Sequence, residues 1–144
     1  MKAGMVLILL GTLVGCSLKP QPAASNEMKA QEPLSKLVRV SLNERFVARS
    51  LRTELSPGEA NTVQYRLLSI DLTEVENSPR TFKFEYRMPE MPEMGVFESA
   101  VEFDGKVLKG DLDIVHGGWW EVKILIEEPG KPVDEITFDY QVAE

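Results

Sequence analysis

From about residue 37 onward, hydrophobic and polar residues alternate with a period of two. Such alternation places every second side chain on the same face of a β-strand, so each run predicts a strand with one buried face. The runs cover residues 38–42, 63–67, 82–86, 101–103, 120–126 and 136–142. Strands with one apolar and one polar face are typical of antiparallel sheets that pack on a single core.

Residues that favour turns separate these runs. Asp104-Gly105, between Phe103 and Lys106, is the strongest hairpin signal. Residues 46–55 remain open between strand and helix, because their Val and Thr favour a strand while the apolar spacing also fits one helix face. Seven or eight short strands in this arrangement predict an all-β fold, an immunoglobulin-like antiparallel β-sandwich.

The start of the chain has a different pattern. Residues 5–14 are an uninterrupted apolar run, too short to cross a bilayer as a helix but typical of a signal peptide. The run leads into Leu13-Val14-Gly15-Cys16, which resembles the lipobox of bacterial lipoproteins. The resemblance implies that Cys16 becomes an acylated N-terminus, held on a membrane outside the cytoplasm. The alternative is an ordinary signal peptide with an incidental cysteine.

The chain therefore divides into three predicted parts. Residues 1–15 are a lipoprotein signal peptide that is cleaved, and residues 36–144 are the sandwich domain. Residues 16–35 contain three prolines among mostly polar residues, which is the composition of a flexible tether. Ser17 after the cysteine resembles a signal for outer-membrane sorting, which implies the periplasmic face of the outer membrane in a cell with two membranes.

Composition restricts the chemistry. The 144 residues carry a formal charge of −7 and contain one cysteine and one histidine. Net negative charge argues against a nucleic-acid partner, and one cysteine excludes an intramolecular disulfide or a zinc site with several cysteines. No nucleophile elbow, phosphate-binding loop or His-Glu-x-x-His motif is present in the sequence. We therefore expect a protein that is not an enzyme.

Half of the six methionines lie in the run Met88-Pro89-Glu90-Met91-Pro92-Glu93-Met94. The prolines predict a polyproline II segment with three residues per turn, which places the methionines on one face about 9 Å apart. Thioethers are soft ligands that select Cu(I), so Met88, Met91 and Met94 are candidate metal ligands. Alternatively, the run is a crossover whose methionines fill the end of the core or form a contact surface.

The methionine run also carries a family resemblance. The strand 82–87 leading into Met-Pro-Glu-Met, followed by Gly118-Trp119-Trp120 and another alternating strand, resembles the YtkA-like/FixH-like extracytoplasmic domains. The turn Ser56–Asn61 is similar to one in the same group. The resemblance implies an immunoglobulin-type sandwich and an association with copper handling, including oxidase assembly. No histidine accompanies the methionine run, which favours Cu(I) over Cu(II).

His116 and Trp119 are the remaining candidate site residues. His116 could complete a Met/His site if its turn folds over the methionine run; alternatively, it is an ordinary residue at a hairpin end. Trp120 continues the inward-facing set of its strand, so it is expected in the core. Trp119 points the other way and is a candidate contact for a partner protein.

The charged residues suggest solvated surfaces. Asp111 and Asp113 share one strand face, which could offer oxygen ligands to calcium but more simply faces water. Glu127-Glu128 and Asp134-Glu135 flank a Pro-Gly turn and are interpreted as solubilising charge. Arg45, Arg49 and Arg52 form a basic cluster that Glu44 and Glu54 counterbalance, which predicts a mixed, solvated surface.

These observations lead to two hypotheses. The first is a non-enzymatic envelope lipoprotein that binds or delivers Cu(I) through Met88, Met91 and Met94, with a copper-handling or oxidase-assembly protein as partner. The second is an envelope interaction or scaffolding module that uses the methionine run and Trp119 without a metal. Both place the chain on a membrane through lipid on Cys16.

Overall fold

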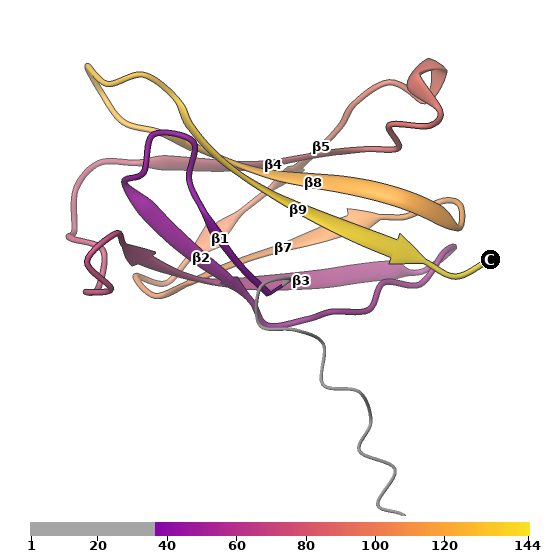
Figure 1. The fold of residues 1–144 in the computed structure, drawn as a ribbon, viewed down its shortest axis with the longest axis horizontal. Helices are drawn as coiled ribbons and strands as arrows, with labels where there is room; N and C mark the ends of the chain where they lie inside the picture. The colour runs from indigo at the N-terminus through magenta and orange to yellow at the C-terminus, as the bar shows by residue number, and fades with distance from the viewer. Residues whose placement is uncertain (1–36) are drawn as a thin grey trace, which may run out of the picture. The chain divides into compact units, whose positions relative to one another are not determined.

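The computed structural model describes residues 37–144 as two antiparallel β-sheets packed face to face (Figure 1). The first sheet has the strand order β1-β2-β3-β7-β6 and the second has the order β5-β4-β8-β9. The strands of the first sheet are β1 (Val38–Val40), β2 (Phe46–Ser50), β3 (Ala60–Ser69), β6 (Glu102–Phe103) and β7 (Val107–Asp113). Those of the second are β4 (Thr81–Arg87), β5 (Phe97–Ala100), β8 (Gly118–Glu127) and β9 (Asp134–Val142), and a 3₁₀ helix, η1 (Pro92–Met94), lies between β4 and β5.

The strand order confirms the predicted all-β sandwich. In the immunoglobulin fold one sheet has the order A-B-E-D and the other contains G-F-C-C′. Strands β2, β3, β7 and β6 follow the first order, and β9, β8, β4 and β5 follow the second. Residues 37–144 contain nine strands rather than seven or eight. The four-residue edge strand β5 was not predicted, because its single large apolar residue, Phe97, gives almost no alternation.

The segment that was open between strand and helix contains a strand. Residues 46–50 form β2, which pairs with β1 on one side and with β3 on the other. Its Ala48 lies opposite Leu67 of β3. Hydrogen bonds to two neighbouring strands stabilise the extended form of this segment. A helix here would leave the backbone N–H and carbonyl groups of those neighbours unpaired.

Large inward-facing side chains from both sheets fill the core. The Tyr65 ring of β3 lies between the Phe84 and Phe138 rings of the opposite sheet, at centroid distances of 5.4 and 4.7 Å. The Tyr65 hydroxyl is satisfied inside the core by the Tyr140 hydroxyl at 2.8 Å. Gly110 of β7 faces Phe84, and a Cβ there would come within 2.8 Å of that ring. The sheets therefore approach closely only because residue 110 has no side chain.

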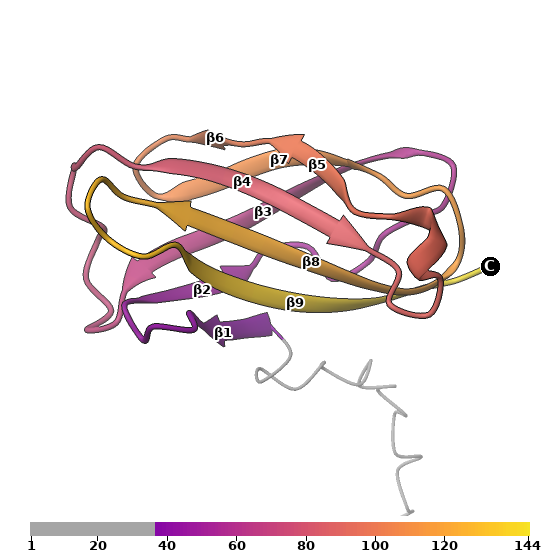
Figure 2. The ribbon, with the colours of Figure 1, turned by 90° about the horizontal axis from the view of Figure 1, so that it is seen from above.

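The loops gather at two ends of the sandwich. The connection 88–96, the connection 114–117 and the C-terminus lie at one end, which we call the methionine end. The loops 41–45, 70–80 and 128–133 lie at the other, which we call the hairpin end. Figure 2 shows both ends from above, with η1 at the methionine end.

Buried ion pairs hold the hairpin end together, and they correct two expectations. Glu128 and Asp134 are 8% and 0% exposed, so they do not act as solubilising surface charge. Arg45, expected on a solvated surface, binds Glu128 at 3.3 Å and Asp134 at 3.2 Å. Arg80 and Lys131 also bind Glu128, at 3.0 and 2.6 Å. Alternation patterns cannot show that three loops converge on one carboxylate.

The same arginines cover an aromatic ring. The guanidinium groups of Arg45 and Arg80 lie 5.2 and 5.5 Å from the Phe46 ring centroid. Cation–π contact and the ion pairs therefore act on the same two side chains. By contrast, Asp111 and Asp113 are exposed on β7, as expected of a solvated strand face.

No helix within residues 37–144 is long and apolar enough to cross a membrane.

Replacing Glu128 with Gln should destabilise the domain by about 3 kcal/mol, because Arg45 and Arg80 would lose their shared carboxylate. Burial raises the pKa of Glu128, but the hydrogen bonds and charges of Lys131 and Arg80 outweigh it and hold that pKa below its ordinary value of 4.5. The stabilisation is therefore complete above about pH 4.5 and is lost as the pH falls through the lowered pKa.

Urea unfolding at pH 7 and at pH 3.5 measures both effects. Glu127→Gln is the matched control, because Glu127 is exposed. Equal unfolding free energies for the two variants at pH 7 would contradict the assigned role of Glu128.

Candidate functional site: the methionine loop

Two consecutive turns shape residues 88–95, which we call the methionine loop. The Met91 N–H donates to the Met88 carbonyl at 3.1 Å, and the Met94 N–H donates to the Met91 carbonyl at 3.0 Å. The prediction of a polyproline II segment is therefore wrong, since that conformation has no internal hydrogen bonds. The reason is topological: the loop joins neighbouring antiparallel strands, with Tyr86 opposite Phe97, and an extended segment would run away from β5.

The prolines fit these turns. Pro89 follows Met88 at the second position of the first turn, where its fixed φ is favourable. Pro92 begins η1, where a missing N–H costs nothing. Gly95 closes the loop with φ 77°, a left-handed conformation that glycine adopts easily. Proline therefore shapes this loop, but into turns.

The three methionines face the core. Met88 is 3% exposed and belongs to the core, while Met91 and Met94 are half-buried and pack against it. Each of the two turns brings the Cα atoms at its ends within about 7 Å of each other, so successive methionines start close together. Glu90 and Glu93 are exposed. The loop therefore presents thioethers at the border between core and solvent, with carboxylates outside.

Aromatic rings flank the methionine loop. Tyr86 precedes it and Phe97 follows it, and their rings stack at 5.4 Å. Trp120 lies 6.1 Å from each of these rings and is fully buried, which confirms its predicted place in the core. The loop thus begins and ends at a three-ring cluster that excludes water from one side.

Met88 also contacts the loop that contains the histidine. A Cβ on Gly118 would lie 2.7 Å from the Met88 methyl carbon, and Gly118 has φ 124°. His116 is two residues away, and its carbonyl accepts the Trp120 indole N–H at 3.0 Å. Its side chain is exposed. The structure therefore brings the backbone near His116 to Met88 but leaves the imidazole in solvent.

Trp119 is 40% exposed, which confirms the outward orientation predicted for it. It borders a cleft of about 170 Å³ between the end of β2 and β9, together with Arg52 and Tyr140. Arg52 is already bound to the carbonyls of Glu54 and Thr62. Cys16, the predicted lipidation site, lies outside the described residues.

The turn before β3 depends on Asn61. This side chain is fully buried, accepts the Ser56 N–H at 2.8 Å and donates to the carbonyls of Ser56 and Glu59, both at 2.8 Å. A buried amide that satisfies three backbone groups is a structural residue. The Ser56–Asn61 motif therefore has a clear physical purpose in the fold.

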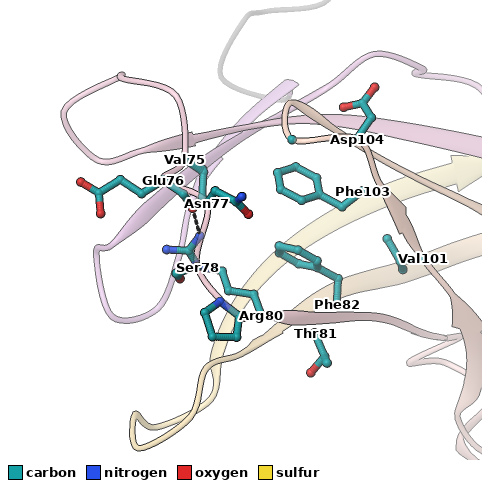
Figure 3. A pocket seen from close by; sticks show the side chains of 12 residues that line it. Val75, Glu76, Asn77, Ser78, Arg80, Thr81, Phe82, Val101, Phe103 and Asp104 are labelled. Carbon is teal, nitrogen blue, oxygen red and sulfur yellow. Dashed lines mark hydrogen bonds between the residues drawn. The ribbon is translucent and has the colours of Figure 1, made fainter.

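A groove of about 1080 Å³ lies at the hairpin end and was not predicted from the sequence (Figure 3). Phe82 and Phe103 face each other in it, with ring centroids 4.8 Å apart. Its polar groups are used in the fold: Arg80 binds the Glu76 carbonyl, and Asp104 accepts the N–H groups of Lys106 and Val107. These backbone hydrogen bonds lower the pKa of Asp104. The groove walls come from distant segments, which no local motif could reveal.

Within residues 37–144, no three side chains among His, Cys, Asp and Glu converge as a metal-binding group.

Truncating Met88 to Ala should destabilise the domain by about 2 to 4 kcal/mol, because a buried core side chain is lost. Met88→Leu preserves volume and should cost less than about 1.5 kcal/mol. Met91→Ala is the control. Because Met91 is only half-buried, this substitution should lower the free energy of unfolding by less than Met88→Ala does. Urea unfolding gives these values, and an equal loss for both Ala variants would refute the burial difference.

No family model matches the chain, and no curated protein matches it. The resemblance to YtkA-like/FixH-like domains therefore stays a prediction that rests on the motifs quoted above.

Proposed function

We propose that this protein is a non-enzymatic envelope lipoprotein that binds or delivers Cu(I) through its methionine loop. One observation carries the proposal: two successive turns keep Met88, Met91 and Met94 close together, and all three pack on the core, Met88 buried and the other two half-buried. The turns bring the Cα atoms of successive methionines within about 7 Å, against about 9 Å in polyproline II. Flexible thioethers can share one ion more readily across the shorter step.

The surroundings suit a soft monovalent ion. Met91 and Met94 are half-exposed and would meet the ion first, while Met88 would supply a ligand from the buried side. Thioethers favour Cu(I), whereas the exposed carboxylates of Glu90 and Glu93 are poor ligands for it. An apolar shell around a metal site limits access of water. The rings of Tyr86, Phe97 and Trp120 supply such a shell on one side.

A second candidate function is protein interaction without a metal. The observation that favours it is the exposure of Val96 and Trp119, 55% and 40%, at the same methionine end. Aromatic residues and methionine are enriched in protein interfaces. A copper-handling or oxidase-assembly protein of the envelope is the partner class that we propose for either function.

Replacing all three loop methionines with Leu should weaken Cu(I) binding by at least a hundredfold, because thioether sulfur is removed while core volume is kept. Competition against a coloured Cu(I) chelator under reducing conditions measures the affinity. Met28→Leu, outside the loop, is the matched control and should leave the affinity unchanged.

Equal affinity of the triple Leu variant and the wild type would refute the copper proposal. If neither binds Cu(I), but Trp119→Ser and Val96→Ser abolish crosslinking to one envelope protein, the interaction function is supported instead.

The anchor has its own test. Membrane-extracted protein should give an intact mass that corresponds to a chain starting at acylated Cys16, since acyl chains provide stable membrane attachment. Cys16→Ser should remain uncleaved and unacylated. An unmodified thiol at residue 16 in the wild-type protein would contradict the lipoprotein assignment.

A further inference from the structure

Four aliphatic side chains project into solvent from three loops of the hairpin end. They are Leu42, Ile70, Leu72 and Val133, with exposures of 71%, 48%, 66% and 51%. Figures 1 and 2 show the three loops at the same end of the sandwich, opposite the methionine loop. We call these four residues the aliphatic tip.

Hydrogen bonds tie the three loops to one another. The Leu42 N–H donates to the Glu135 carbonyl at 2.8 Å, and the Asn43 side chain donates to the Val133 carbonyl at 3.3 Å. The Ile70 N–H donates to the Arg45 carbonyl at 3.0 Å. The aliphatic tip is therefore built on a fixed framework, and its members are not scattered surface residues of the kind that need no explanation.

The backbone at Leu72 shows that folding does not require leucine there. Its φ is 65°, a left-handed conformation that is unfavourable for a residue with a Cβ. Its side chain is two-thirds exposed, so burial does not compensate for that strain. Glycine or asparagine would suit the turn better. A leucine at such a position points to a contact outside the folded domain.

The charges around the aliphatic tip decide what kind of surface it fits. Arg45, Arg80 and Lys131 pair with Glu128 and Asp134 within the domain, which leaves this cluster with one positive charge. Glu44 and Asp71 are exposed next to the tip. These carboxylates would therefore repel an anionic surface. A bilayer with zwitterionic headgroups would not repel the tip, and its hydrocarbon interior could take up the aliphatic side chains.

We infer that the aliphatic tip docks the domain onto a zwitterionic lipid bilayer, the one that carries its anchor. This inference rests on the lipid anchor proposed at Cys16, which 20 residues separate from Leu37. Strand β1 begins at Val38, four residues before Leu42, so the described chain starts within about 13 Å of the tip. The strength of membrane binding scales with the apolar area buried at the interface.

Docking in this way would orient the proposed copper site. Strand β8 spans ten residues between the two ends, a length of about 33 Å. The methionine loop would then face away from the membrane, toward the aqueous compartment and its partners.

The test uses the acylated full-length protein in phosphatidylcholine vesicles that contain lipids with a nitroxide quencher in the acyl chain. One variant carries an environment-sensitive fluorophore on Leu72→Cys, and the matched control carries it on Val96→Cys, at the methionine end. Cys16 is the only native cysteine, so acylation leaves the introduced thiol as the only one. We expect at least fivefold stronger quenching at residue 72 than at residue 96.

Further variants separate docking from folding. Leu42→Asn in the labelled Leu72→Cys protein should reduce the quenching severalfold at an unchanged melting temperature. Leu72→Asn should raise the melting temperature. The same change should weaken vesicle binding when it is made in a protein that lacks the signal segment and carries Cys16→Ser. Raising salt should not release the domain, because the contact is apolar.

Equal quenching of the two labels would overturn the inference. It would also be overturned if the label at residue 72 were shielded from water but not quenched by the nitroxide lipid. The second result would mean that a protein covers the tip. The Cu(I) affinity is measured at the other end, so loss of either proposal leaves the other unaffected. The contrast between the labels is also measured with vesicles added to unacylated protein, which separates failure of the anchor from failure of docking.

Discussion

The pairing register between β4 and β8 is the constraint on which the methionine end depends. Seven consecutive pairs, from Thr81 opposite Glu127 to Arg87 opposite Glu121, fix which side chains face the core. A slip of one residue would turn Phe84 and Tyr86 outward and move Met88 away from Gly118. Because the same register buries Trp120 beside Tyr86, the methionine loop and its aromatic wall are set by one sheet.

The two ends of the sandwich have different physical character. Ion pairs around Glu128 hold the hairpin end, which leaves its aliphatic side chains pointing outward from a rigid base. Apolar packing holds the methionine end, where sulfur and aromatic rings meet at the edge of the core. The two proposals, a soft-metal site at one end and a lipid contact at the other, would together let one small domain stand on a membrane with its site facing the aqueous side.

Alternation in the sequence predicted β3, β4, β8 and β9 because each has one face on the core. It placed Trp120 inside and Trp119 outside correctly for the same reason. It could not predict β5, whose four residues carry little pattern, nor the burial of Glu128 and Asp134, which depends on arginines 48 to 89 residues away. For the methionine loop, spacing indicated one shared side, but local proline rules suggested an extended segment. The need to return to β5 imposed turns instead.

The most direct measurement of the copper proposal is methyl NMR of the protein labelled with ¹³C-methyl methionine, titrated with Ag(I) as a redox-inert substitute for Cu(I). The account predicts that the methyl signals of Met88, Met91 and Met94 shift together and saturate at one ion per chain. The signal of Met28 should stay in place. If no loop methyl shifts, or if Met28 shifts as much as they do, the methionine loop is not a metal site.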